Sequence, residues 1–314
     1  MILVTGATGT IGSEVVRQLA ARGEKVRAQS RDPAGARVPS GVETAPGHHR
    51  DRASVEAAMA GAEAAFLVGV FGPDDVEHDR GLVAAARAAG VRRIVKLSAI
   101  GTGDPRLGAG DPQSGEGEGE GEGEAKAEAE GEGAPRVGGF GTWHLYGEEA
   151  VKASGLEWTI LRPSNFASNT LSWSQTIQEG TPALNMMGGG KQGVVDPRDV
   201  AEIAVAALLD PRHSGRTYTL TGPETLSAHE QAAVLGEILG RPVRLRDLSP
   251  EQRREQLLAA GLGEAYADAL VIAARFIQDG GSDVVTEDVP EVLGRPARTY
   301  REWVVDHREA FGVS

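Results

Sequence analysis

The sequence predicts an α/β protein, a Rossmann-type, doubly wound parallel sheet joined to a smaller, mostly helical substrate-binding domain. Two observations lead to this class. Three glycines follow the first apolar strand at a spacing that suits a nucleotide-binding turn, and short apolar runs then alternate with helical segments. The length of 314 residues is enough for one large domain or two closely joined ones.

The first half of the chain contains five predicted strands and three predicted helices. Apolar runs without alternation, such as Phe66-Leu67-Val68, suit strands that are buried on both faces. The strands are expected at 2–4, 24–30, 42–45, 64–70 and 93–98, and the helices at 13–22, 52–59 and 75–89.

The second half begins with one more βα-like stretch and becomes mostly helical. A helix is expected at 142–154, a strand at 157–162, a helix at 199–209, a strand at 216–221, and further helices at 227–239, 250–260, 266–278 and 300–311. We therefore expect a nucleotide-binding domain of residues 1–163 plus 194–222, and a smaller domain of residues 164–193 plus 223–314.

Composition excludes several classes of protein. The net charge of −13 argues against binding to nucleic acid or to an anionic membrane. The chain has no cysteine, which excludes disulfides and thiolate chemistry. It also lacks an apolar run of about 18 residues and the features of a signal peptide, so a cytoplasmic location is expected.

Much of the negative charge lies in one segment. Residues 113–135 carry eight glutamates against one lysine, in a Gly-Glu alternation that cannot bury apolar surface. We expect a disordered surface insertion, because loops accept long insertions at low entropic cost. A docking element for a basic partner and a lid over a substrate site are the alternatives.

The segment Val4–Gly12 carries the clearest functional signal. Its G-x-x-G-x-x-G spacing stands between a strand and a helix, where the glycines permit a tight turn, close approach of a pyrophosphate and close helix–strand packing. The helix N-terminus then faces the anion. The predicted dinucleotide contacts here come from Gly6, Thr8, Gly9, Thr10, Ile11 and Gly12.

Cofactor preference is predicted at the end of the second strand. A carboxylate there favours NAD, whereas an arginine favours the 2′-phosphate of NADP. The sequence places Ser30 and Arg31 first, and Asp32 can instead cap the turn at Pro33. NADP(H) is therefore preferred over NAD(H), with a solvated surface role for Arg31 as the alternative.

With these features the chain resembles the NmrA-like atypical short-chain dehydrogenase/reductases, which include quinone and triphenylmethane dye reductases and redox-sensing regulators. The motifs that carry the likeness are Gly6-x-x-Gly9-x-x-Gly12, Ser30–Pro33, Val95–Ser98, Ser154–Pro163, Asp196–Ala201 and Tyr218–Glu224.

Two departures from the family pattern matter. His48 stands where relatives commonly carry an aspartate for the adenine, so His49 or backbone groups are expected to hold it; the paired histidines predict no metal site. The usual Tyr-x-x-x-Lys register falls on Phe140 and His144, and Tyr146 is rotated about 200° from His144 on the helix. The standard catalytic dyad is absent.

The resemblance and the positions of the strands indicate the remaining site residues. His144 is the candidate to hold the ribose or donate a proton, since its unperturbed pKa lies near neutrality, with a helix-packing or exposed role as the alternative. Ser98, at the carboxyl end of the fifth strand, is the candidate to polarise a carbonyl, with turn capping as the alternative. Arg162 is expected to pair with a carboxylate such as Asp199, and Glu148 to face solvent. Further cofactor contacts are expected from Val68, Gly69, Val70, Pro163, Asn165 and Phe166, and substrate contacts from Phe71, Trp143, Asn165, Phe166, Asn169 and Trp173.

These features predict an NADPH-dependent reductase of a quinone, enone or aromatic ketone. Such acceptors stabilise the anion formed by hydride addition, which suits a site without the tyrosine. A redox sensor without turnover and a non-redox use of the fold are the alternatives. The expected partner is a flat, aromatic small molecule, and the expected assembly is a monomer or a homodimer.

Overall fold

A parallel sheet forms the centre of the computed structural model, which describes residues 1–48, 51–69, 75–108 and 140–312. Within them, seven strands pair in the order β3-β2-β1-β4-β5-β6-β9. All the neighbouring pairs are parallel. The strands are β1 (Ile2–Val4), β2 (Val26–Ser30), β3 (Glu43–Pro46), β4 (Ala64–Val68), β5 (Arg93–Leu97), β6 (Glu157–Pro163) and β9 (Arg216–Leu220).

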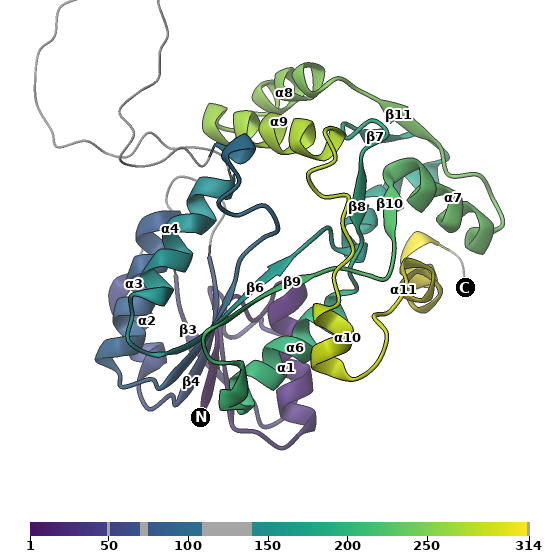
Figure 1. Ribbon diagram of the computed structural model, residues 1–314. Coiled ribbons are helices and arrows are strands. Elements are labelled where there is room, and N and C mark those ends of the chain that lie inside the picture. The colour runs from purple at the N-terminus through teal and green to yellow at the C-terminus, as the bar shows by residue number, and fades with distance from the viewer. Residues whose placement is uncertain (49–50, 70–74, 109–139, 313–314) are drawn as a thin grey trace, which may run out of the picture.

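Helices cover both faces of this sheet (Figure 1). On one face α1 (Thr10–Ala21) packs on α6 (Pro197–Leu209), and α10 (Asp288–Leu293) lies beside α6. On the other face lie α2 (Arg52–Met59), α3 (Asp75–Ala88) and α4 (Phe140–Lys152). Two apolar clusters, one on each face, account for the strands being buried on both sides, as their unalternating sequences predict.

The order of the strands creates a crevice at one edge of the sheet. The chain proceeds from β1 outward to β2 and β3, and then returns to β4 on the other side of β1. Ligands of open α/β sheets bind at such a switch point, outside the carboxyl ends of the strands. The parallel register brings Gly6, Arg31, Gly69, Ser98 and Asn165, each of which follows the end of a strand, to this same edge.

The rest of the chain forms smaller sheets and helices beyond that edge (Figure 1). An antiparallel pair joins β8 (Lys191–Gly193) to β10 (Thr225–Ser227), and a parallel pair joins β7 (Ala183–Asn185) to β11 (Leu245–Asp247). A third apolar cluster, which includes Tyr300 and Trp303, fills this region. Its helices are α5 (Ser174–Glu179), α7 (Ala228–Leu239), α8 (Pro250–Ala259), α9 (Glu264–Gln278) and α11 (Tyr300–His307), and its 3₁₀ turns include Ala167–Trp173 and Arg308–Phe311.

The predicted fold class is confirmed, and most predicted elements differ from the observed ones by one to three residues at their ends. The sequence did not predict the four short strands of the small sheets or helices α5 and α10. The acidic insertion at 113–135 lies outside the described residues. The division into two domains stays a prediction.

Candidate functional site

The turn between β1 and α1 has the geometry of an anion cradle. Gly6 has a φ of +58°, which favours glycine, and its carbonyl accepts a hydrogen bond of 2.9 Å from the amide of Gly9. A Cβ built on Gly12 would lie 2.2 Å from the oxygen of Gly6, so only glycine fits there without moving the turn. A Cβ on Gly6 would lie 3.1 Å from Cβ of Val68, which therefore packs against the turn from β4.

Helix α1 presents an open N-terminus at this turn. Its N-cap is Gly9, its first turn carries no acidic side chain, and Thr8, Gly9 and Thr10 are exposed. The first amides of a helix have no partner within the helix, so those of Thr10, Ile11 and Gly12 are available to an external acceptor. With the helix dipole, this cradle fits the pyrophosphate of a dinucleotide.

The end of β2 separates the roles of three neighbouring side chains. The carboxylate of Asp32 accepts a hydrogen bond of 3.1 Å from the amide of Gly35, so it caps its own turn as the sequence allowed. The Ser30 hydroxyl donates to the Asp32 carbonyl at 3.0 Å and accepts from its amide at 3.1 Å. Arg31 is exposed and forms no ion pair with the described residues. An exposed cation therefore follows β2 at the sheet edge, beside a carboxylate that caps its own turn.

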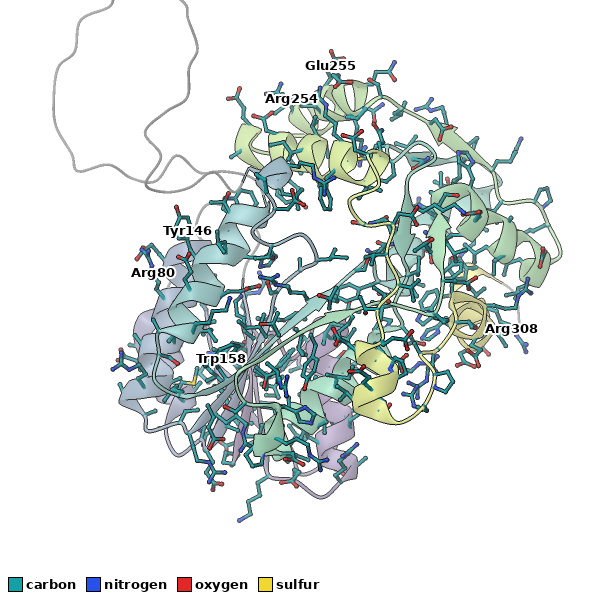
Figure 2. All side chains as sticks on the ribbon, viewed as in Figure 1. Arg80, Tyr146, Trp158, Arg254, Glu255 and Arg308 are labelled. Carbon is teal, nitrogen blue, oxygen red and sulfur yellow. The ribbon has the colours of Figure 1, made fainter. Side chains whose placement is uncertain are left out.

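Helix α4 carries His144 and Trp143 inside the protein. His144 is 7% exposed and Trp143 is 1% exposed, so both side chains are buried. Burial lowers the pKa of His144 to about 3, and the charge of Lys96 contributes to the same effect. His144 is therefore neutral at physiological pH. Tyr146, two residues on, lies instead against Arg80 of α3, 5.9 Å from guanidinium carbon to ring centre (Figure 2).

Ser98 lies at the end of β5, and its hydroxyl donates a 2.7 Å hydrogen bond to Oε1 of Glu148. The same carboxylate receives two bonds from Arg162, Nε to Oε1 at 2.8 Å and Nη2 to Oε2 at 2.6 Å. Because Ser98 has a single hydroxyl hydrogen, polarising a substrate carbonyl would require it to leave Glu148. The catalytic role of Ser98 stays a prediction.

Two expected environments are wrong. Glu148 is fully buried rather than solvated, and Arg162 pairs with it rather than with Asp199. Asp199 pairs instead with Arg295 at 2.8 Å and with Arg298. Burial raises the pKa of Glu148, but the bonds from Arg162 and Ser98 outweigh it and hold that pKa below its usual value.

A buried ion pair lies beside this network and had no assigned role in the sequence. Nζ of Lys96 in β5 is 2.6 Å from Oδ2 of Asp79 in α3, and both side chains are 1% exposed. A Cβ on Gly147 would lie 2.0 Å from that same oxygen, so this glycine lets α4 approach the pair. The signal in the sequence was a lysine between the apolar residues Val95 and Leu97 of a buried strand.

The residues after β6 lie at the same edge of the sheet as the cradle. Pro163 ends β6, Phe166 is bridged to Val195, and Asn169 donates a 2.7 Å hydrogen bond to the side-chain oxygen of Asn165. Strands lie about 4.8 Å apart, so β6, three strands from β1, is about 14 Å from the cradle. An extended dinucleotide that begins at the cradle can follow this edge toward Asn165.

A cavity of about 250 Å³ opens beside Asn165. Three of the predicted substrate contacts, Asn165, Asn169 and Trp173, line it. Its other walls come from the turn Ala167–Trp173, from the small sheets and from α7 and α8. The sequence placed these segments in the smaller, substrate-binding domain but named none of the following residues as contacts. They are Thr170, Ser172, Leu184, Asn185, Met186, Met187, Gln192, Gln231, Leu248 and Arg253.

The remaining expectations concern residues and sites that the structure describes only in part. His49, Val70 and Phe71 lie outside the described residues, while Gly69 follows β4 at the sheet edge. Among the described residues no cluster of three His, Asp or Glu side chains could hold a metal ion. None of the described helices is long and apolar enough to cross a membrane.

Comparisons with known sequences agree with these features. The model of an NAD(P)H-binding family matches residues 6–211. A (4-alkanoyl-5-oxo-2,5-dihydrofuran-3-yl)methyl phosphate reductase of Streptomyces griseus is 38% identical over 312 residues, which cover 99% of both chains. An NAD(P)H azoreductase of Xenophilus azovorans is 35% identical over 316 residues, which cover 100% of both.

Solved structures share the fold. The NADPH-dependent quinone oxidoreductase QOR2 of Escherichia coli, in complex with NADPH, superposes with a TM-score of 0.75 at 23% identity, covering 98% of this chain and 100% of that one. Triphenylmethane reductase of Citrobacter, in complex with NADP(H), has a TM-score of 0.74 at 21% identity, covering 98% and 99%. A mutant of NmrA also shares the fold, with a TM-score of 0.71 at 18% identity, covering 100% of this chain and 98% of that one. The family model and the full-length relatives agree with the resemblance: the chain belongs to the NAD(P)H-binding family.

Proposed function

We propose that this protein is an NADPH-dependent reductase that transfers hydride to a quinone, enone or aromatic ketone. The observation that carries the proposal is the open glycine cradle of α1, together with the cavity at the same edge of the sheet. Two relatives that match the whole chain are named as reductases, one of a phosphorylated alkanoyl-dihydrofuranone and one of azo compounds. An alkanoyl-dihydrofuranone is an unsaturated carbonyl compound, in keeping with the proposed class.

Arg31 supports NADPH over NADH. Its guanidinium is exposed and forms no ion pair with the part of the chain that the structure describes, whereas Asp32, the carboxylate that would favour a ribose 2′-hydroxyl, accepts a hydrogen bond from the amide of Gly35. An arginine binds a phosphate through several donors at once. We assign the 2′-phosphate to Arg31, with Ser30 beside it.

The chain's own residues then bind NADPH and the acceptor and hold them in position for hydride transfer. NADPH, when bound, supplies a hydride. The cradle holds its pyrophosphate, and Asn165 and Phe166 line the path toward the cavity. His144 does not act as an imidazolium acid, because burial and Lys96 keep it neutral. It contributes to holding the ribose through a neutral ring, and the anion of the reduced acceptor takes its proton from solvent.

The test is the loss of NADPH absorbance with purified protein and a panel of quinones, enones and aromatic ketones, with NADH in parallel. We expect protein-dependent oxidation of NADPH. Arg31→Ala should raise the KM for NADPH about tenfold or more and leave that for NADH nearly unchanged, because a charge-assisted bond to phosphate is lost. Arg37→Ala, an exposed arginine of the same loop, is the matched control.

Tight binding of NADPH without turnover on any acceptor would contradict the reductase and favour the redox-sensor alternative. If Arg31→Ala raised the KM for NADPH and the KM for NADH by the same factor, Arg31 would not be the residue that binds the 2′-phosphate. A cytoplasmic location and a monomeric or homodimeric assembly stay predictions.

A further inference from the structure

The cavity beside Asn165 is lined by a cation that has no carboxylate partner among the residues the structure describes. Arg253 of α8 is half-buried, and its one side-chain hydrogen bond within the described chain is from Nη1 to Oε1 of Gln256, at 3.2 Å. Most other partly or fully buried arginines among the described residues pair with carboxylates, whereas Arg241 bonds the carbonyl of Phe311. Examples are Arg27 with Glu43, Arg93 with Glu157, Arg162 with Glu148 and Arg198 with Asp196. The charge of Arg253 is thus available to something in the cavity.

A second polar group lines the same cavity. Gln231 of α7 is 3% exposed, and its side-chain amide forms no hydrogen bond with the described residues. The amide atoms are accessible from the open space of the cavity, where a ligand or water can accept or donate a hydrogen bond. Gln231 supplies an N–H donor to the same space that Arg253 lines.

The other walls divide the cavity chemically. Met186, Met187 and Trp173 offer apolar surface, while Asn165 and Asn169 lie on the side of the sheet edge and use one bond between themselves. A ligand that suits these walls has an apolar body and an oxyanion end. Guanidinium and amide donors together match the oxygens of a phosphate or a carboxylate.

From these contacts we infer that the cavity binds an anionic group of the substrate, a phosphate monoester or a carboxylate, which accepts hydrogen bonds from Arg253 and Gln231. The inference rests on the proposed function in taking this cavity as the substrate site. It adds a specificity determinant, since a substrate without the charged group would leave Arg253 and Gln231 unsatisfied. The carbonyl end of such a substrate then extends past Asn165 toward the sheet edge.

The test is calorimetric titration of the NADP⁺-bound protein with hexyl phosphate, hexanoate and hexan-1-ol. At least one anion should bind about tenfold or more tightly than the alcohol, because a charge-assisted bond is gained. The anion that binds more tightly identifies the charged group of the substrate: hexyl phosphate indicates a phosphate monoester, and hexanoate indicates a carboxylate. Equal binding of the alcohol and both anions, or no binding of any, would overturn the inference.

Two variants place the binding at the cavity. Arg253→Gln should lose about tenfold or more of the anion affinity and nearly all of the difference from the alcohol. Arg254→Gln is the control, because the guanidinium of Arg254 bonds Asp268 and does not line the cavity. Figure 2 labels Arg254 on α8. Gln231→Leu should weaken anion binding by a smaller factor, and it keeps the test decisive if Arg253→Gln does not fold. Unchanged anion affinity in a folded Arg253→Gln or Gln231→Leu protein would overturn the assignment.

This measurement is independent of turnover. Anion binding that depends on Arg253 in a protein that oxidises no NADPH would contradict the proposed reductase and leave the anion site standing. NADPH oxidation by a protein that binds the anions no more tightly than the alcohol would support the reductase and contradict the anion site.

Discussion

Nζ of Lys96 lies 2.6 Å from Oδ2 of Asp79 beneath helix α4, and both side chains are 1% exposed. Removing one member of such a pair leaves a buried charge without its partner, which costs about 3–5 kcal/mol. We therefore expect Asp79→Leu to lower the free energy of unfolding by about that amount. In the double variant Asp79→Leu/Lys96→Met most of the loss should be recovered, because neither charge remains. Urea denaturation at pH 7.5 measures both, and a double variant no more stable than Asp79→Leu would contradict the argument.

Glu148 provides a second stability test. Its fully buried carboxylate joins Ser98, which follows β5, to Arg162 of β6, so Glu148→Ala leaves Arg162 without its ion-pair partner. The free energy of unfolding should fall by about 3 kcal/mol. Glu149→Ala, at the exposed neighbouring position, should change it by less than about 0.5 kcal/mol. Similar losses in the two variants would show that the buried network does not carry the effect.

The pKa of His144 predicts a pH dependence of stability. Because folding lowers this pKa from its ordinary value of about 6.5 to about 3, the unfolded chain binds a proton in that window and the folded chain does not. The contribution of neutral His144 to the free energy of unfolding is therefore fully present above about pH 6.5 and is lost as the pH falls toward 3. Between pH 7.5 and 5 the share of His144 is about 2 kcal/mol. Urea titrations of wild type and His144→Gln should differ by that amount in their pH dependence, and equal dependence would refute the assignment.

Gly12 tests the cradle directly. A Cβ at this position would lie 2.2 Å from the oxygen of Gly6, so Gly12→Ala must open the turn. We expect the affinity for NADPH to fall about tenfold or more, in line with the cost of overpacking a tight site. Gly81→Ala is the control, since a Cβ there meets no atom within 4 Å. Fluorescence titration with NADPH gives both values, and unchanged affinity in Gly12→Ala would show that pyrophosphate does not approach this turn.

The features that the sequence predicted well are those that depend on neighbouring residues. The turn at Gly6–Gly12 follows from glycine spacing, and the capping role of Asp32 follows from the turn at Pro33. Glu148 could not be assigned in this way. Glu148 and Glu149 are adjacent, and a helix separates them by about 100°, so one can face the sheet and the other solvent. Choosing between them requires Arg162 and Ser98, which come from two strands.

Of the residues that line the cavity, the sequence predicted only Asn165, Asn169 and Trp173, which follow β6. Its other walls come from β7 and β11, strands of three residues each, which are too short to give a recognisable alternation. Arg253 stands in the polar run Glu251–Glu255, where nothing distinguishes it from Arg254. Only the packing of α8 places one guanidinium in the cavity and the other against Asp268.

The cradle and the cavity come from separate parts of the chain. The cradle is complete by Gly12, whereas the apolar and cationic walls of the cavity begin at Trp173 and end at Arg253. Substitutions at Met186, Met187 or Arg253 therefore touch none of the groups that we assign to the pyrophosphate. A library of variants confined to these positions could evolve new acceptors while the hydride donor stays the same.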